Sequence, residues 1–258
     1  MRYMSAAHTD VGISKEKNQD SFCLETAKTT RGNVAFCILC DGMGGLQAGE
    51  LASSFLVNAF ARWFENELPD SLQGGVDFKK IENRWRDIAK EQAAKIMEYG
   101  RAHGYSKGIG TTLTAVLVYE GSYIYIQVGD SRMYQLGAEM TQITADQTLI
   151  AREIAQKRLT EEQAKTDSRR SVLLQCIGAT REVSPEIGTG SLAAGEELML
   201  CSDGFRHEIS SDEIFGVLAP SLMNDERTMK KSLVDLVNLN KNRGERDNIT
   251  VLLLKARA

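Results

Sequence analysis

Four aspartates stand next to apolar, strand-like runs of the sequence. Asp41 directly follows Val34–Cys40, Asp130 and Asp203 each follow a similar run, and Asp247 precedes one. If the last of these strands runs antiparallel to the other three, all four carboxylates meet at one edge of the fold. Crowded carboxylates repel one another and raise each other's pKa, a conflict that a divalent cation resolves. Ligands that are all oxygens favour Mg²⁺ or Mn²⁺ over zinc.

Two of these aspartates also allow a simpler interpretation. Asp41 and Asp203 are each followed by glycine, and Asp-Gly is a common turn dipeptide because both residue types suit tight turns. For either pair taken alone, a turn is the better interpretation. Other motifs in the chain have to decide between a turn and a metal site.

The elements that must position these aspartates are predicted from the spacing of apolar residues. Three segments carry one apolar stripe, as helices that cover a core do: 48–68, 78–100 and 226–240. Strand-like runs are 34–40, 112–119, 123–128, 132–136, 140–143, 198–201 and 249–254. Glu120-Gly121 and Gly137-Ala138 suggest hairpins and therefore antiparallel pairing. We predict an α+β fold: one domain over residues 1–258, built as a β-sandwich of two mainly antiparallel sheets flanked by helices on both sides (α/β/β/α).

Composition narrows the class of protein. A net charge of −4 over 258 residues argues against a bulk nucleic-acid or membrane-surface binder, which is usually basic. The first residues lack the apolar core of a signal peptide, and the longest apolar run, Val34–Cys40, is far too short to span a bilayer. The five cysteines are expected to be reduced thiols in the cytoplasm. Cys37 and Cys40 would point to opposite faces of one strand, so we expect core positions and no shared metal or disulfide.

Nine short motifs occur along most of the chain. They are TDVG at 9–12, KEKNQDS at 15–21, DGMGGLQAGE at 41–50, GTT at 110–112, VGDSR at 128–132, TADQ at 144–147, IG at 177–178, SDGF at 202–205 and RDNIT at 246–250. The ordered series resembles the metal-dependent protein phosphatase family, the type 2C serine/threonine phosphatases, in its compact bacterial form. One Asp-Gly pair would be weak support, but nine blocks in the family's order and spacing favour the metal site over simple turns.

The resemblance implies a binuclear metal centre of Mn²⁺ or Mg²⁺. Asp41 would bridge the two ions, and the backbone carbonyl of Gly42 would bind one of them. Asp203 and Asp247 would complete the ligands of the other ion. The implied reaction is hydrolysis of a phosphate ester by metal-activated water, without a covalent enzyme intermediate.

Three further residues receive roles from the resemblance. Asp130 matches a residue that shares a possible third ion with Asp203 in bacterial relatives. Asp20 matches a carboxylate that orients metal-bound water. Lys15 stands where the family usually has an arginine that grips the substrate phosphate, so we expect the charge to be kept but the two-pronged contact to be lost.

Two other departures from the family pattern concern hydrogen bonding and proton transfer. Gln19 replaces the usual glutamate beside Asp20, a mild change because an amide oxygen still accepts hydrogen bonds. A histidine proposed as general acid in many members is absent, because its two usual positions hold Met43 and Leu46. Of the three histidines, His207 is the best substitute because its loop neighbours a metal ligand, although an ordinary surface or hydrogen-bonded histidine is the better interpretation.

A charged segment at about 149–176 resembles the family's flap beside the active site, which we expect to form a subdomain. A solvated pair of helices is an equally good interpretation.

The predicted function is a metal-dependent protein serine/threonine phosphatase of the cytoplasm. Its partners would be phosphorylated proteins, including a cognate serine/threonine kinase and that kinase's substrates, with no nucleic acid and no membrane. One alternative is a non-catalytic scaffold that binds phosphoproteins, which the four clustered aspartates argue against. Another is a phosphatase of small molecules, which the sequence does not separate from the main hypothesis.

Overall fold

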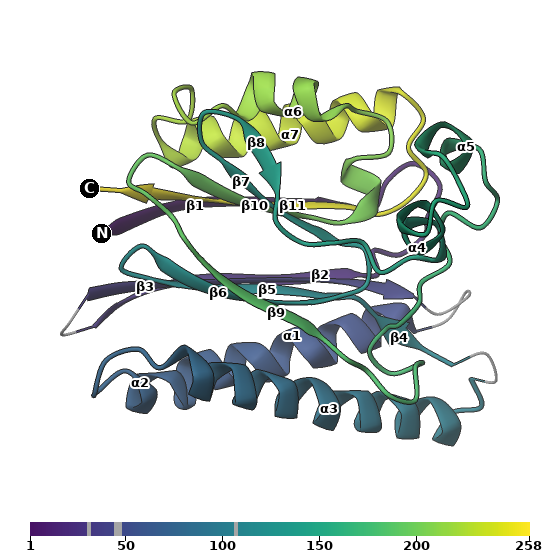
Figure 1. Ribbon diagram of the computed structural model, residues 1–258, viewed down its shortest axis with the longest axis horizontal. Helices are drawn as coiled ribbons and strands as arrows, with labels where there is room; N and C mark the ends of the chain where they lie inside the picture. Colours follow the sequence, from purple (N-terminus) through teal and green to yellow (C-terminus); the bar gives the residue numbers. More distant parts are fainter. Residues whose placement is uncertain (30–31, 44–47, 106–107) are drawn as a thin grey trace.

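The computed structural model describes residues 1–29, 32–43, 48–105 and 108–258. Two antiparallel sheets lie face to face (Figure 1). The first has the strand order β1 (Arg2–Asp10), β11 (Ile249–Arg257), β10 (Glu197–Cys201), β7 (Arg132–Leu136) and β8 (Met140–Gln142). The second has the order β2 (Asp20–Thr29), β3 (Gly32–Met43), β5 (Leu113–Tyr119), β6 (Ser122–Val128) and β9 (Glu186–Ser191), and β4 (Gly110–Thr111) pairs with the end of β3.

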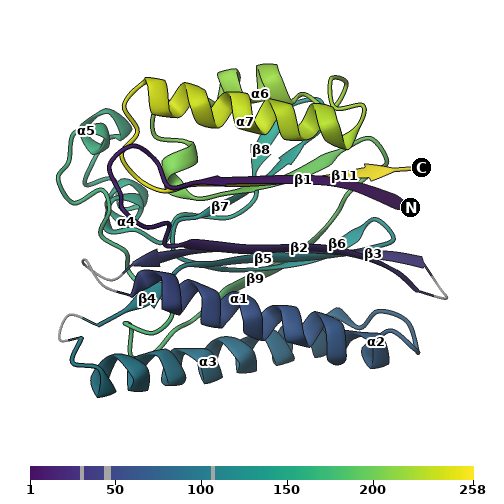
Figure 2. The same cartoon turned by 180° about the vertical axis from the view of Figure 1, so that it is seen from behind.

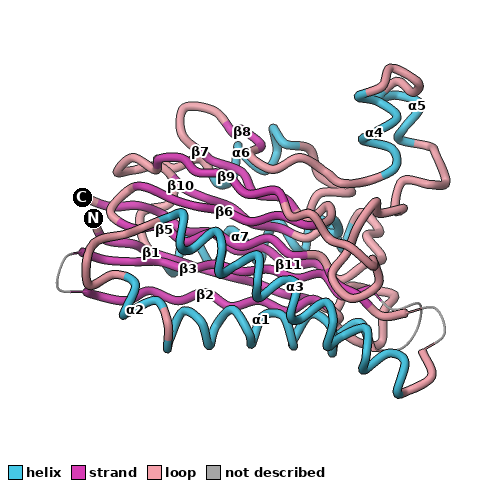
Figure 3. Tube along the Cα trace, turned by 60° about the horizontal axis from the view of Figure 1, so that its bottom comes forward, coloured by secondary structure: helices cyan, strands magenta, loops and turns pink. Residues whose placement is uncertain are grey.

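Helices close the sandwich on both sides. α1 (Gly49–Asn66), α2 (Leu68–Ser71) and α3 (Phe78–Ala102) lie on the side of the second sheet, and α6 (Ser211–Leu218) and α7 (Glu226–Asn242) on the side of the first (Figures 1 and 2). The short helices α4 (Leu149–Ala155) and α5 (Glu161–Lys165) stand apart at one end, as Figure 3 shows. The predicted sandwich flanked by helices on both sides is confirmed. Among the described residues, no helix has the length and apolar character needed to cross a bilayer.

Three apolar layers hold these elements together. Phe36 and Trp85 belong to the layer between the second sheet and its helices, and Leu233 belongs to the layer under α6 and α7. Leu39 and Leu252 fill the space between the two sheets. β3 and β11 are therefore buried on both faces, which explains why their sequences are apolar almost throughout and were recognised as strands.

The two cysteines of the C-x-x-C sequence are core residues on opposite faces of β3. Cys37 faces the layer between the sheets, and Cys40 faces the layer under the helices. Both are fully buried, and all five cysteines are free thiols. The two side chains lie on opposite faces because residues three apart in a strand point to opposite sides of the sheet.

Several elements were not predicted from the sequence. β1, β2, β9 and α6 are present in addition to the expected segments. β1 and β2 lie at the edges of their sheets, and Met4 and Ala6 are the only residues of the two strands that are buried, so their apolar signal is weak. The connection between β7 and β8 spans three residues, 137–139, rather than a two-residue turn. Between 149 and 176 the structure contains α4 and α5, two short helices, which fits the helical-pair interpretation of that segment.

The chain directions bring the four aspartates to one end of the sandwich. β11 runs antiparallel to β10, so Asp247 before β11 lies at the same end as Asp203 after β10. β5 pairs antiparallel with both β3 and β6, so the ends of β3 and β6, which carry Asp41 and Asp130, also coincide. Each sheet thus contributes two of the four carboxylates.

Candidate active site

A cavity of about 430 Å³ opens at the end of the sandwich where the strands of both sheets terminate. Asp41, Asp130, Asp203 and Asp247 all line it, together with Lys15. Its remaining lining residues are Gln19, Gly42, Met43, Thr112, Ser171 and Leu173. Five residues singled out for their side-chain chemistry are therefore brought together, although they lie up to 232 positions apart in sequence, from 15 to 247.

Asp41 is fixed by its backbone, which leaves its carboxylate available to the cavity. Its N–H donates to Thr112 Oγ1 at 2.8 Å, and its carbonyl accepts from Thr112 N–H and Thr111 Oγ1, both at 2.9 Å. Burial raises the pKa of Asp41 well above its usual range, and the charges of Asp20 and Asp203 raise it further. A proton or a cation is needed to relieve that repulsion.

Asp20 lies directly opposite Asp41 in the β2–β3 pairing. Its Oδ2 accepts a hydrogen bond of 2.6 Å from Thr250 Oγ1, while its Oδ1 is buried without a partner among the described residues. Burial and the nearby Asp203 raise the pKa of Asp20 to about 7, against the hydrogen bond from Thr250 that lowers it. Asp20 is thus close to the aspartate cluster but does not line the cavity.

Asp203 and Asp247 come from the first sheet. Asp203 begins a single 3₁₀ turn (Asp203–Phe205) after β10, and its Oδ1 is buried without a hydrogen-bond partner in the described part of the chain. Asp247 Oδ1 accepts from the N–H of Asn248 at 2.8 Å and pairs with Lys15 Nζ at 2.9 Å. An unsatisfied buried carboxylate oxygen is costly, which makes Asp203 a candidate ligand position in this cavity.

Lys15 reaches the cavity from the loop between β1 and β2. Burial alone would lower the pKa of Lys15, but the hydrogen bond to Asp247 and the charges of Asp41 and Asp203 raise it. The ammonium is therefore held charged beside the carboxylates, where it can meet a phosphate.

Asn248 holds the Lys15 loop in place, a role that the sequence did not reveal. Its Oδ1 accepts from the N–H of Gln19 at 2.9 Å, and its Nδ2 donates to the carbonyls of Val11 and Lys17 at 2.9 and 3.1 Å. Asn248, which follows Asp247 in the sequence, thus positions the loop that carries Lys15. Among the described residues, Lys15 is the only lysine that lines the cavity. The place of Asn248 inside the RDNIT motif was a signal, although the motif alone assigns no partner.

Gly42 is packed so closely that no side chain fits. A Cβ atom there would lie 2.5 Å from the carbonyl oxygen of Gln19 and closer still to that of Gly49. The N–H of Gly42 donates to the same Gln19 carbonyl at 3.1 Å. The backbone of Gly42 can therefore line the cavity next to Asp41. Residues 44–47, which include the expected histidine position Leu46, lie outside the described residues.

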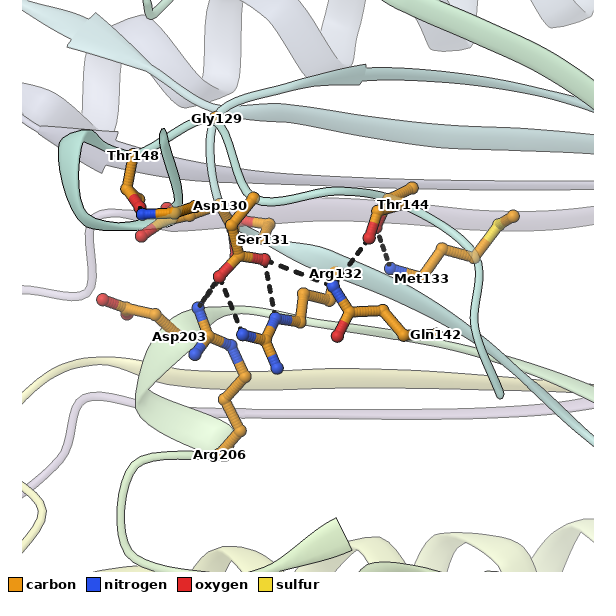
Figure 4. Close-up of polar contacts among 12 residues, drawn as sticks. Gly129, Asp130, Ser131, Arg132, Met133, Gln142, Thr144, Thr148, Asp203 and Arg206 are labelled. Carbon is orange, nitrogen blue, oxygen red and sulfur yellow. Dashed lines mark hydrogen bonds and ion pairs between the residues drawn. The ribbon is translucent and has the colours of Figure 1, made fainter. Parts of the chain in front are cut away.

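Arg206 contacts the loop that carries Asp130 and shares a carboxylate partner with Arg132 (Figure 4). Arg206 donates from Nη2 to the Asp130 carbonyl at 3.0 Å, and its guanidinium lies 3.6 Å from Asp146. Arg132 grips Asp146 with two hydrogen bonds of 2.7 Å. Burial and the charge of Asp203 raise the pKa of Asp130 to about 7, against the lowering effect of Arg206. The sequence did not identify Arg206, because its partners come from distant segments.

The histidines occupy different places. His207 lies beside the cluster, with Nε2 at 3.5 Å from Asp203 Oδ2 and Nδ1 at 3.1 Å from Glu245 Oε2. Burial would lower the pKa of His207, but Glu245 and Asp203 raise it. His103 instead stacks on Tyr99 near the end of α3, and His8 lies in β1 beside Lys230. Met43, at one of the two usual positions of the family's histidine, lines the cavity, but its thioether has no proton to donate to a leaving group.

The donor set fits Mg²⁺ or Mn²⁺. Carboxylate oxygens and a backbone carbonyl are hard ligands, and Asp203 Oδ1 lacks any other partner among the described residues. In the described part of the chain, no three His, Cys, Asp or Glu side chains converge closely enough to enclose an ion by themselves. That spacing is compatible with Mg²⁺, which keeps several waters and usually needs only one or two carboxylates.

Comparison with known proteins identifies the family. The model of the protein phosphatase 2C family matches residues 9–238.

The chain belongs to the protein phosphatase 2C family.

Individual relatives agree with this assignment. The chain is 32% identical over 251 residues to the protein phosphatase PhpP of Streptococcus pneumoniae, covering 95% of this chain and 94% of PhpP. The serine/threonine phosphatase Stp1 from Staphylococcus aureus superposes with a TM-score of 0.85 at 28% identity, covering 100% and 96% of the two chains. The catalytic domain of the phosphatase PstP, solved in complex with two manganese ions, superposes with a TM-score of 0.78 at 29% identity over 99% of both chains. This phosphatase therefore shares its family and its fold with protein serine/threonine phosphatases.

Proposed function

We propose that this protein serine/threonine phosphatase acts through divalent ions held by Asp41, Asp203, Asp247 and the carbonyl of Gly42. Asp130 and Asp203 would together bind a third ion, with lower affinity than the first two. The observation that supports this most is the meeting of four aspartates from two sheets, with Lys15, in one cavity. The pKa of Asp41 is raised first by burial and further by the neighbouring carboxylates, which is the electrostatic setting that a cation would relieve.

Each part of the cavity has a distinct task in hydrolysis. Divalent ions would supply Lewis-acid chemistry, because they lower the pKa of water and neutralise charge on phosphoryl oxygens. Lys15 would bind the substrate phosphate as a point charge, and Asp20 would orient water through its free Oδ1. Thr111 and Thr112 hold the backbone of Asp41, so that its carboxylate is already oriented when substrate arrives.

The identity of the ions and of the partners forms a second part of the proposal. We infer Mn²⁺ or Mg²⁺ from the hard oxygen ligands, and the two manganese ions bound to PstP support Mn²⁺. The substrates are phosphoproteins. We expect them to be a cognate serine/threonine kinase of the cytoplasm and the proteins that this kinase phosphorylates. We also propose that residues 1–258 form a single catalytic domain with a flap subdomain at about 149–176.

The decisive experiment is a turnover assay with a panel of phosphoserine and phosphothreonine peptides, phosphorylated small metabolites and p-nitrophenyl phosphate, all with added Mn²⁺. We expect the peptides to be hydrolysed with higher kcat/KM than the metabolites. A protein that binds the peptides but turns over none of these substrates would instead be a scaffold.

Changing Lys15 should alter substrate binding more than chemistry. Lys15→Ala removes the cation that faces the phosphate, so we expect KM for phosphopeptides to rise about tenfold with a smaller change in kcat. Lys15→Arg restores the charge and adds a two-pronged donor, so KM should be equal to or below that of the wild type. Steady-state kinetics of the two variants test this, and an unchanged KM in Lys15→Ala would make Lys15 a surface residue without a substrate role.

A further inference from the structure

A second, larger groove leads away from the active-site cavity along the charged segment 149–176, here called the flap. Its volume is about 1080 Å³. Asp130, Ser171 and Asp203 line both the groove and the cavity. The two spaces are therefore continuous, and a chain segment attached to a phosphoryl group in the cavity can extend into the groove.

The flap side of the groove is built from small and apolar side chains. They are Ile150, Ala151, Ile154, Ala155, Ala164 and Leu174. Leu174 is 40% exposed although it is a large apolar residue. A wall of this kind leaves room for the backbone of an extended peptide, and apolar exposure beside an active site is typical of a binding surface.

Charge on the groove is unevenly neutralised. Arg152 and Arg170 line the groove and are exposed, and among the described residues neither forms an ion pair. Two other flap arginines are paired within the flap itself: Arg158 lies 3.6 Å from Glu153, and Arg169 lies 2.7 Å from Asp167. Neither Arg158 nor Arg169 lines the groove. The unpaired arginines are thus the ones that face the groove.

The floor of the groove adds positive charge. Arg206 lines it, and its Nε is buried without a hydrogen-bond partner among the described residues. Arg206 shares Asp146 with Arg132, so one carboxylate serves two guanidinium groups. Of the other acids that line the groove, Asp130 and Asp203 belong to the proposed metal site, which leaves Glu161. The groove therefore has an excess of cations over acids available to a ligand.

We propose that this groove binds the part of a phosphoprotein next to the phosphorylated residue and selects acidic side chains there, chiefly through Arg152 and Arg170. The proposal rests on the function proposed above, since the phosphoryl group must occupy the cavity at the same time. An acidic segment matches the excess positive charge, and its backbone fits the small apolar wall. Because the groove leaves the cavity on one side, the preference applies to acids on one side of the phosphorylated residue only.

The test uses three phosphothreonine peptides of equal length. One has neutral flanks, one has two acidic residues before the phosphothreonine, and one has the same two residues after it. The two acidic peptides carry equal charge, so a general attraction affects them equally. Exposed ion pairs change an equilibrium by a factor of roughly 1.5 to 5 each, so we expect one acidic peptide to exceed the other about fivefold in kcat/KM at low salt. The difference should shrink as ionic strength rises.

Variants of the flap assign that preference to residues. In Arg152→Ala/Arg170→Ala the ratio between the two acidic peptides should fall below about twofold, and in Arg152→Glu/Arg170→Glu it should invert. The matched control is Arg158→Ala/Arg169→Ala, which removes the same charge from the same flap outside the groove and should keep the wild-type ratio.

Three outcomes would overturn the proposal: equal kcat/KM for the two acidic peptides in the wild type, a ratio that survives in Arg152→Ala/Arg170→Ala, or an equal loss in the control. Hydrolysis of p-nitrophenyl phosphate without hydrolysis of any phosphopeptide would instead refute the protein phosphatase function, and the groove proposal with it.

Discussion

Asp41→Asn should lower kcat/KM for phosphopeptides by roughly 10³-fold or more, because the substituted side chain can no longer hold divalent charge against the phosphoryl group. The same change should stabilise the protein in the absence of divalent ions. Burial and the charges of Asp20 and Asp203 raise the pKa of Asp41 well above its usual range. A carboxyl with a higher pKa in the folded than in the unfolded state favours folding at low pH, and this contribution is lost as the pH rises through the folded-state pKa.

Thermal unfolding in EDTA measures the second effect. At pH 7.5 the melting temperature of Asp41→Asn should exceed that of the wild type by about 3 °C or more, since about 1 kcal/mol corresponds to 2–4 °C for a chain of this size. At pH 5 the advantage should be smaller. Asp235→Asn is a suitable control, because Asp235 lies in α7, is largely exposed and pairs only with Lys231 at 2.7 Å among the described residues. Near-wild-type turnover in Asp41→Asn would remove Asp41 from the active site.

Removing divalent ions should abolish phosphatase activity, with a loss of at least about 10³-fold. Added Mn²⁺ or Mg²⁺ should restore it. The same ions should raise the melting temperature of the wild type, because a ligand that binds only the folded state stabilises it by an amount that grows with the logarithm of its concentration relative to its Kd. This rise should be much smaller in Asp41→Asn.

The combination of assays separates metal binding from catalysis. Melting curves report binding without substrate, whereas turnover requires both binding and chemistry. Full activity in a sample whose metal content is below the detection limit of elemental analysis would contradict the metal-dependent mechanism. Stabilisation of Asp41→Asn by Mn²⁺ equal to that of the wild type would place the ions elsewhere.

The buried strands were predictable because burial on both faces leaves an unbroken apolar signature. β3 and β11 pack against a helix layer on one side and the other sheet on the opposite side, so nearly every residue is apolar. β1 and β2 are edge strands with few buried residues and were missed. Their identity as strands depends on partners far along the chain, since β1 pairs with β11 and β2 with β3.

The site was predictable where a residue acts through its own side-chain chemistry at a strand end, and it was not where a residue acts through distant partners. Asp41 and Asp203 stood out because each stands at the end of an apolar strand and belongs to the motif series that resembles a known family, although either Asp-Gly pair alone would indicate only a turn. Arg206 lies outside the motifs, and the motif that contains Asn248 assigns it no partner, because their contacts with the Asp130 and Lys15 loops exist only after the two sheets have packed. The groove lined by Arg152 and Arg170 is likewise a property of the folded flap.

The pairing of β1 with β11 has a practical consequence for immobilising the enzyme. Arg2 lies opposite Arg257 and Asp10 opposite Ile249, so the described termini leave the sandwich together, at the end away from Asp247 (Figures 1 and 2). Nine residues of extended strand place them roughly 30 Å from the cavity. A tether at either terminus should therefore attach the phosphatase to a bead or sensor surface with its catalytic end directed toward the solution.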